Sequence, residues 1–304
     1  MNAKIQQWLA AGPLVTDGGW GTQLQQRGLP LGAVPDLWNL SEPEKVESVA
    51  NAYIAAGSDV ILTNTFGANR FLLARHNAAE KMAEINRCGV EISKKAADAA
   101  GRRVLVFASI GPSGVLLMTG QETPESLYEA FRVQAEALRA GGADAIVVET
   151  MSDPAEAAAA VMAAKTTRLP VVACMTFDSG KNKDRTMMGT TPEKAVEALS
   201  AAGADVIGSN CGQGIDGFIP LCRRMRDVTD LPLWMKGNAG LPEMIDGKTV
   251  YRQTPEHFAD VAVTLLDEGA MFLGGCCGTD PEYIAELRKR VDAWSAKDQD
   301  KEKK

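Results

Sequence analysis

The chain has 304 residues, of which 45% are apolar, 23% are charged and 6% are aromatic. This composition is typical of a globular protein and excludes low-complexity disorder and collagen-like sequence. The 39 acidic and 32 basic residues give a net charge of -7. The chain therefore offers no strongly basic face, and we expect no nucleic-acid partner.

The sequence predicts neither a secretory signal nor a membrane span. The N-terminal segment MNAKIQQWLAAGP lacks the long apolar core of a signal peptide. The longest uncharged stretch, residues 104–121, is interrupted by Gly111-Pro112-Ser113-Gly114 and indicates a strand followed by a loop. We therefore expect a cytoplasmic protein without membrane contact.

Short runs rich in Val, Ile and Leu recur along the chain. Most are continuous rather than alternating, which is typical of strands buried on both faces. The predicted strands cover residues 14–16, 59–63, 104–110, 145–150, 171–177, 206–210, 233–236 and 271–274.

Helical periodicity separates these strands, and several predicted helices begin at or near a proline. A faint repeat, Ala-Gly-Ser-Asp-Val at 56–60 and its variants at 141–145 and 202–206, ends a helix and opens the next strand. Clear helical examples are 44–56, 124–140, 192–202, 255–268 and 281–294.

This alternation predicts an α/β protein, a single (β/α)8 TIM barrel, over residues 1–296. Residues 297–304, KDQDKEKK, are expected to form a charged, disordered tail. A three-layer open sheet is the alternative. Its expected dinucleotide fingerprint is poorly matched, because the glycine-rich turn at 17–22 begins with Asp and contains Trp20.

In such barrels the reactive groups lie at the carboxyl ends of the strands. Polar residues there cost free energy to bury unless they are used or paired, so we take them as candidate site residues. They are Asp17, Thr63-Asn64-Thr65, Ser109, Glu149-Thr150, Asn210-Cys211, Asn238 and Cys276-Cys277.

Three of the six cysteines lie at predicted strand ends. Adjacent Cys276 and Cys277 can ligate one metal ion if the backbone turns sharply, which the flanking glycines allow. The barrel brings the sixth and eighth strands close together, so Cys211 is expected to join them. Three thiolates suit zinc and leave its fourth position open. The alternative is three buried, inert cysteines.

The remaining thiols and the imidazoles are assigned to other roles. Cys88, Cys174 and Cys222 are expected to pack as small apolar residues, and His76 and His257 to have surface or packing roles. The polar loop 178–185 is either an active-site lid or a solvated loop.

A zinc ion with three thiolates activates water poorly. It suits a fourth thiolate, because the metal lowers the thiol pKa while the sulfur stays nucleophilic. The site therefore favours alkyl transfer to the sulfur of a thiol substrate. For an amino-acid thiol, the N–H groups of Gly18 and Gly19 can hold the carboxylate, and Asp17 and Glu149 the ammonium. A structural role for Glu149 in a barrel layer is the alternative.

Seven motifs along the chain match those of a known family. They are Asp17-Gly18-Gly19, Thr63-Asn64-Thr65-Phe66-Gly67-Ala68, Gly111-Pro112-Ser113-Gly114, Glu149-Thr150, Asn210-Cys211, Gly237-Asn238-Ala239-Gly240-Leu241-Pro242 and Gly274-Gly275-Cys276-Cys277-Gly278-Thr279. Through these motifs the chain resembles the homocysteine S-methyltransferase family over nearly its whole length. This resemblance implies a zinc barrel with Cys211, Cys276 and Cys277 as ligands and Asn238 as a weak fourth ligand that homocysteine displaces. It also implies that Asp17, Gly18, Gly19 and Glu149 hold the amino acid, and we add Asn210 to these substrate-binding residues.

The resemblance also bears on the methyl donor. The betaine-using branch has an aromatic cage, and two of its aromatic residues correspond to Gly67 and Thr150 in this chain, so those two rings are absent. Trp20 and Trp38 can supply part of a cage. The motifs are more similar to the cobalamin-dependent methionine synthase branch, except that Gly237 replaces its usual proline. We therefore expect methylcobalamin carried by a separate corrinoid protein, because these 304 residues contain no corrinoid module.

Other functions stay open at this point. A small onium donor, S-methylmethionine or glycine betaine, is the alternative within the family. A phosphate-binding barrel enzyme leaves the paired cysteines unexplained. A non-catalytic subunit that binds zinc or thiols would bind homocysteine without turnover. The oligomeric state is not determined by the sequence.

Overall fold

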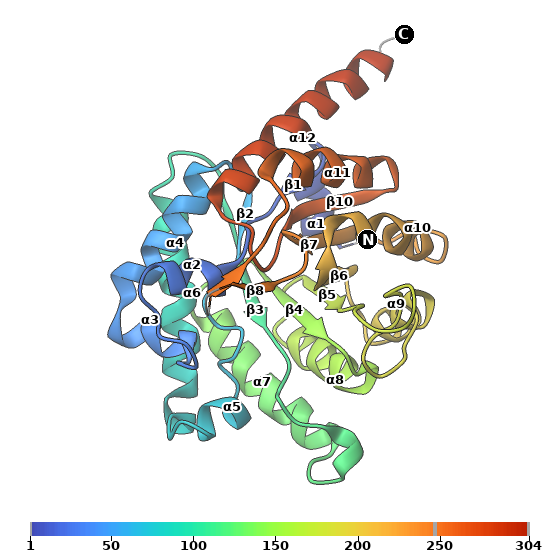
Figure 1. The fold of residues 1–304 in the computed structure, drawn as a ribbon. Coiled ribbons are helices and arrows are strands. Elements are labelled where there is room, and N and C mark those ends of the chain that lie inside the picture. The colour runs from blue at the N-terminus through green and yellow to red at the C-terminus, as the bar shows by residue number, and fades with distance from the viewer. Residues whose placement is uncertain (1, 246–247, 303–304) are drawn as a thin grey trace.

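The computed structural model describes residues 2–245 and 248–302. Eight parallel strands are paired in the order β1-β10-β7-β6-β5-β4-β3-β2, and helices surround them (Figure 1). A parallel bridge between Thr16 and Val60 connects the end of β1 with β2, which closes the ring. The predicted single (β/α)8 barrel is confirmed, and the open sheet is excluded.

All eight predicted strands are present. β6 and β7 run further than predicted and reach Gly214 and Asn238. The barrel strands are β1 (Leu14–Val15), β2 (Val60–Ile61), β3 (Leu105–Ile110), β4 (Ala145–Met151), β5 (Val171–Met175), β6 (Val206–Gly214), β7 (Leu233–Asn238) and β10 (Ala270–Gly275). An antiparallel pair that the sequence did not predict, β8 (Glu243–Ile245) and β9 (Lys248–Val250), follows β7.

The predicted helices are also present, and their caps explain where several begin. Thr123, Thr191 and Thr254 each accept a backbone N–H at the start of a helix whose first residue is proline. The helices are α1 (Ala3–Leu9), α2 (Trp20–Gln26), α3 (Trp38–Ser41), α4 (Pro43–Ala55), α5 (Arg70–Ala74), α6 (Met82–Asp98), α7 (Pro124–Ala140), α8 (Pro154–Lys165), α9 (Pro192–Ala201), α10 (Phe218–Arg226), α11 (Pro255–Asp267) and α12 (Pro281–Glu302).

The C-terminal end differs from the expected disordered tail. Helix α12 continues through residue 297 to Glu302, and Figure 1 shows it projecting from the barrel. Residues 303–304 of the predicted tail lie outside the described residues, and the domain boundary at 296 stays a prediction.

The barrel interior changes from apolar to polar along its axis. Phe107, Trp234 and Phe272 pack together, with the Trp234 ring centroid 5.9 Å from that of Phe107 and 5.3 Å from that of Phe272. Trp8 of α1 lies against the same cluster, 5.3 Å from Phe107. Two residues further along their strands, Ser109 and Lys236 are buried polar groups. Because strand side chains alternate, these two also point inward, so the polar layer lies at the carboxyl end of the barrel.

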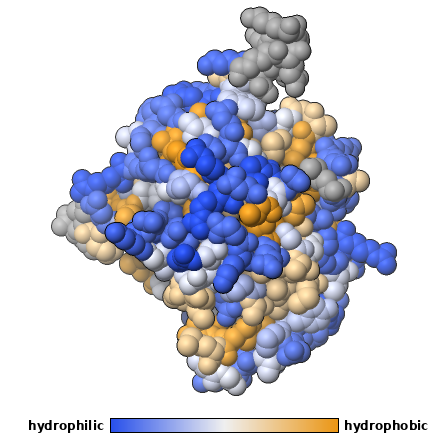
Figure 2. Space-filling model, turned by 90° about the vertical axis from the view of Figure 1, so that its right-hand side faces the viewer, coloured by the Kyte–Doolittle hydropathy of each residue, from blue (hydrophilic) through white to orange (hydrophobic). Residues whose placement is uncertain are grey.

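The outer surface is mainly polar. Figure 2 shows one side of the molecule, where hydrophilic residues predominate and hydrophobic residues form separate patches. In the described part of the chain, none of the helices combines the length and the apolar character needed to cross a bilayer.

Candidate metal and substrate site

Three cysteines converge at the carboxyl end of the barrel. Cys211 lies on β6, and Cys276 and Cys277 directly follow β10, which pairs with β7 beside β6. Their sulfur atoms lie within 4.8 Å of one another, and the Sγ atoms of Cys211 and Cys277 are 3.8 Å apart. Two thiolates bound to one tetrahedral zinc at about 2.3 Å are separated by about 3.8 Å. The donor set and its spacing therefore fit zinc.

The backbone around these cysteines is turned to expose the thiols. Cys211 has a φ of 60°, a left-handed conformation that is uncommon for a residue with a side chain. Gly212 follows with a φ of 78° and passes so close to Thr176 that a Cβ would lie 2.7 Å from its Cγ2. Strain of this kind is concentrated at functional sites. The positive φ and the close approach to Thr176 together explain why the residue after Cys211 is glycine.

The protonation states of the three cysteine thiols depend on one another. Hydrogen bonds from Cys276 and Cys277 lower the pKa of Cys211, and the same contact with Cys211 raises the pKa of Cys276. Groups coupled in this way titrate as a unit. One thiolate at Cys211 is stabilised by its two neighbours, which is a suitable starting state for capturing a cation.

Asn238 connects the two cysteine segments. Its Oδ1 accepts the backbone N–H of Cys277 at 3.1 Å, and its side chain helps to lower the pKa of Cys211. The residue lies at the end of β7 and is 4% exposed. It is thus adjacent to the expected metal position, where the fourth ligand was predicted.

Asp17 forms the centre of a buried polar network. Its Oδ2 accepts the indole N–H of Trp20 and the backbone N–H of Leu62, each at 2.6 Å. Its Oδ1 lies 2.6 Å from the Nζ of Lys236. The sequence predicted Asp17 as a partner for the substrate ammonium, but both of its oxygens already have donors in the protein.

Lys236 lines the same cavity as the cysteines and was not predicted from the sequence. It is 2% exposed and its Nζ lies 5.7 Å from the ring centroid of Trp234. Burial alone lowers the pKa of Lys236, but the carboxylates of Asp17 and Glu149 outweigh burial and hold that pKa above its usual value. Lys236 is therefore a buried cation.

Glu149 is held in place from two sides. Its Oε1 accepts the hydroxyl of Ser109 at 2.5 Å and its Oε2 accepts the Nδ2 of Asn210 at 3.2 Å. Asn210 is fixed in turn, because its Oδ1 accepts the backbone N–H of Thr150 at 2.7 Å. Burial raises the pKa of Glu149, and Lys236 and Ser109 offset this only in part. A cation bound beside Glu149 would favour its charged form.

The two glycines after Asp17 approach the neighbouring backbone closely. A Cβ on Gly18 would lie 2.8 Å from the carbonyl oxygen of Thr279 and from the hydroxyl of Tyr53. The N–H of Gly19 donates to that Thr279 oxygen at 3.0 Å. Among the described residues, the N–H of Gly18 has no acceptor. Of the two predicted anion donors, Gly18 is thus the one whose N–H is unengaged.

One cavity of about 470 Å³ joins these groups. Its walls include the three cysteines, Gly18, Gly19, Glu149 and Lys236. Asp17, Asn210 and Asn238 do not line it. The cavity continues to Asp36, Phe66 and His76, and Phe66 and His76 are exposed.

Other residues considered from the sequence lie elsewhere. Trp20 lines the cavity, whereas Trp38 does not and packs instead under the Nζ of Lys45, 4.7 Å from its ring centroid. Cys174 is buried in the barrel and Cys222 is buried under α11 residues, as expected for packing residues. The loop 178–185 contributes no residue to the cavity.

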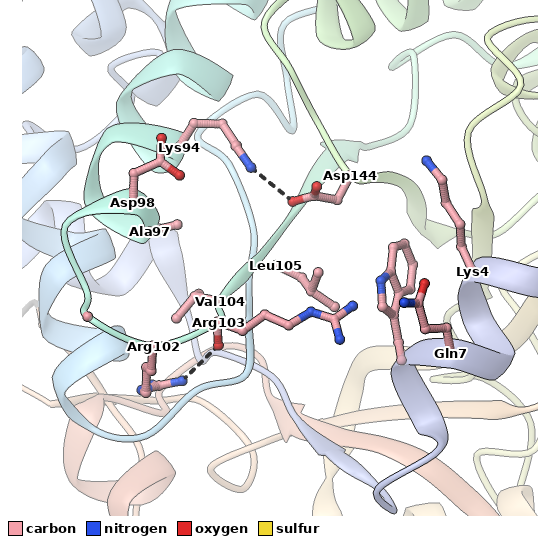
Figure 3. Close-up of a pocket in the computed structure, with 12 residues that line it drawn as sticks. Lys4, Gln7, Lys94, Ala97, Asp98, Arg102, Arg103, Val104, Leu105 and Asp144 are labelled. Carbon is pink, nitrogen blue, oxygen red and sulfur yellow. Dashed lines mark hydrogen bonds and ion pairs between the residues drawn. The ribbon is translucent and has the colours of Figure 1, made fainter.

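A second hollow of about 610 Å³ lies at the opposite end of the barrel, between α1 and the segments that precede β3 and β4 (Figure 3). Lys94 is paired there with Asp144 at 3.3 Å, and Arg102 donates to the carbonyl oxygen of Arg103. This end of such barrels generally serves stability. The hollow contains none of the predicted site residues.

Comparisons with known proteins agree on one family. The family model described as homocysteine S-methyltransferase matches residues 14–291. Relatives described as methionine synthase, from Mycobacterium tuberculosis and Mycobacterium leprae, are 30% and 29% identical over 294 and 306 residues. These alignments cover 91% and 95% of this chain but only 24% and 25% of the relatives. The chain thus spans about a quarter of their length.

Solved structures extend the comparison. The homocysteine methyltransferase MmuM from Escherichia coli, in its metallated form, is 25% identical with a TM-score of 0.75. That match covers 92% of this chain and 96% of the other. The oxidized form of the same enzyme also gives 25% identity and a TM-score of 0.75. The similarity thus extends over nearly all of both chains.

Proposed function

Because the chain belongs to the homocysteine S-methyltransferase family, we propose that it methylates the thiolate of homocysteine at a zinc ion held by Cys211, Cys276 and Cys277. The observation that carries the proposal is the convergence of three sulfur atoms, within 4.8 Å of one another, on a cavity that also contains Glu149. When bound, zinc would lower the pKa of the substrate thiol and keep its sulfur nucleophilic. The product is methionine.

The remaining residues orient the substrate. Glu149, fixed by Ser109 and Asn210, receives the ammonium group of homocysteine. The N–H of Gly18, which has no acceptor among the described residues, donates to the substrate carboxylate. Asn238, which accepts the N–H of Cys277, would be the weak fourth ligand of the metal that the substrate sulfur can replace. Asp17 and Asn210 act as positioning residues behind the cavity wall.

For the methyl donor we propose a methylated corrinoid carried on a separate protein. Support comes from exposed apolar residues in loops at the carboxyl end of the barrel. They belong to the segments that follow β2, β3, β5 and β7, at the same end of the barrel as the cysteines. They are Phe66, Leu116, Met118, Met187, Leu241 and Met244, all exposed. Apolar residues gathered at one end of a protein are typical of an interaction surface.

A small onium donor is the second candidate, and a specific observation favours it. Asp36, Trp20 and Phe66 all line the same cavity. Aromatic faces and a carboxylate together attract sulfonium or quaternary ammonium groups. S-methylmethionine and glycine betaine are donors of this kind and are small enough for the cavity.

The discriminating experiment is an assay of purified protein with homocysteine and each donor in turn: methylcobalamin, S-methylmethionine and glycine betaine. Turnover with methylcobalamin supports the corrinoid proposal, and turnover with betaine alone contradicts this ranking. Homocysteine binding without turnover with any donor would support a non-catalytic subunit.

The metal is tested by elemental analysis and mutation. We expect about one zinc per chain, lost together with activity in Cys276→Ala. Cys88→Ala is the matched control, because Cys88 is a free cysteine on α6 outside the cavity. Full activity of protein without metal contradicts the proposal. Such a thiol site needs a reducing compartment, which supports a cytoplasmic location.

A further inference from the structure

Lys236 has hydrogen-bonding capacity that the protein does not use. Its ammonium group carries three N–H donors. Among the described residues, the only acceptor within hydrogen-bonding distance is Oδ1 of Asp17, at 2.6 Å. The side chain is 2% exposed and lines the cavity together with Glu149 and the cysteines. Two donors of a buried cation therefore remain for a ligand in the cavity.

The ion pair with Asp17 does not by itself explain why the ammonium group of Lys236 is buried. The carboxylate of Asp17 already accepts two neutral donors, from Trp20 and Leu62. A lysine added there must be desolvated, which costs free energy unless further partners are present. An anion in the cavity would provide such a partner and complete the hydrogen bonding of the ammonium.

The charges of the cavity match a zwitterionic amino acid. Glu149 offers one negative charge for an ammonium group, and Lys236 offers one positive charge for a carboxylate. Of the backbone donors near Asp17, the N–H of Gly19 is engaged by Thr279, whereas that of Gly18 has no acceptor among the described residues. A carboxylate accepts more than one hydrogen bond, and Lys236 with Gly18 supplies charged and neutral donors together.

We propose that Lys236 binds the α-carboxylate of the amino-acid substrate and makes the enzyme selective for thiols that carry this group. The inference rests on the proposed function, because it assigns one more contact to the same substrate. Lys236 is then a specificity-determining residue. A thiol without the carboxylate leaves two N–H donors of Lys236 unused and brings its own ammonium near this second cation, so it binds more weakly.

Two thiols isolate this contact. L-homocysteine and 3-aminopropane-1-thiol share the thiol, the carbon chain and the ammonium group, and differ only in the carboxylate. Their affinities for zinc-loaded protein are measured by titration calorimetry, which needs no methyl donor. The wild type is expected to prefer homocysteine. In Lys236→Met this preference should fall at least about tenfold, since a buried charge contact is lost.

A fall in both affinities by the same factor, with the preference unchanged, overturns the assignment of Lys236. If the wild type binds neither thiol, the proposed function fails as well, so the two failures are distinguishable. Lys165→Met is the matched control, because Lys165 pairs with Asp205 at 2.7 Å away from the cavity. This control should keep the wild-type preference.

The Lys236→Met variant leaves Asp17 without its cationic partner, and the unpaired buried carboxylate destabilises the fold. The double variant Asp17→Asn with Lys236→Met removes both charges, and the amide oxygen of Asn can still accept from Trp20 and Leu62. It should melt as cooperatively as the wild type and show the same loss of preference for homocysteine. A double variant that folds and retains the full preference overturns the proposal.

Discussion

Individual residues of the site differ in how far their roles could be foreseen. Cys211, Cys276, Cys277 and Glu149 were predicted because each is a reactive residue at a strand end. Lys236 was missed because the predicted strand ends at this residue, although a lysine at an inward position of an apolar strand was a usable signal. Pairing between Asp17 and Lys236 spans 219 positions in the sequence. No local pattern reveals such a contact.

Glu149→Gln separates a substrate contact from a structural role in the barrel layer. Gln keeps an oxygen for the hydroxyl of Ser109 but loses the charge that we propose as the partner of the ammonium group. Affinity for homocysteine should fall about 10- to 100-fold, which corresponds to the 1.5–3 kcal/mol of a hydrogen bond to a charged group. Calorimetric titration measures it. Glu193→Gln, on α9 outside the cavity, is the control. Unchanged affinity combined with lower stability would identify Glu149 as structural.

Asp36 predicts a pH dependence of stability. Burial raises the pKa of Asp36 from 3.8 to about 7. Between these values the folded protein holds a proton that the unfolded chain releases, so the free energy of unfolding falls as pH rises through this window. Asp36→Asn has no carboxyl group to titrate and therefore lacks this pH dependence. It keeps an oxygen for the N–H of Gly67, which Asp36 accepts at 3.0 Å. Its stability relative to the wild type should rise by up to about 3 kcal/mol between pH 5 and pH 8.

Urea unfolding at these two pH values measures the difference. Asp178→Asn removes an exposed carboxylate and serves as the control. If the difference between Asp36→Asn and wild type is the same at both pH values, burial does not perturb this carboxyl group.

At the scale of elements, continuous apolar runs were sufficient to find the barrel strands, since strands buried on both faces lack polar alternation. Proline after threonine located the starts of α7, α9 and α11. The β8–β9 hairpin was missed, although Asp246-Gly247 in the sequence between its strands is a typical hairpin signal. The extensions of β6 and β7 were missed because glycine and polar residues there resemble a loop. These extensions carry Cys211 and Asn238.

Gly208 tests how tightly β6 and β7 pack. A Cβ at this position would lie 1.8 Å from the carbonyl oxygen of Trp234, the residue with which Gly208 is paired. Gly208→Ala must therefore displace the strand beneath the site, and we expect a loss of about 3 kcal/mol in the free energy of unfolding. Gly21→Ala is the control, because a Cβ added to Gly21 would meet no other atom within 4 Å. Equal stabilities of the two variants would show that the strands adjust freely.

At the scale of the whole molecule, the barrel and the metal site have separate sources of stability. The large apolar core includes residues from every barrel strand, so it holds the strands together without Cys211, Cys276 and Cys277. Zinc would connect β6 to the end of β10, and both strands are already joined through β7. The metal therefore adds to an existing fold rather than creating it.

Removing zinc should accordingly lower the melting temperature without unfolding the protein at room temperature. An ion that binds only the folded state stabilises it by about 4 kcal/mol when its free concentration is 1,000 times its dissociation constant. Circular dichroism of chelator-treated protein should keep the helical spectrum, whereas a thermal scan should show a lower midpoint that added zinc restores. In Cys276→Ala added zinc should give little or no shift, because one of three ligands is missing. Loss of the helical spectrum on chelation would mean that the barrel depends on the metal, as small zinc domains do, and a midpoint that does not respond to zinc would place the ion elsewhere.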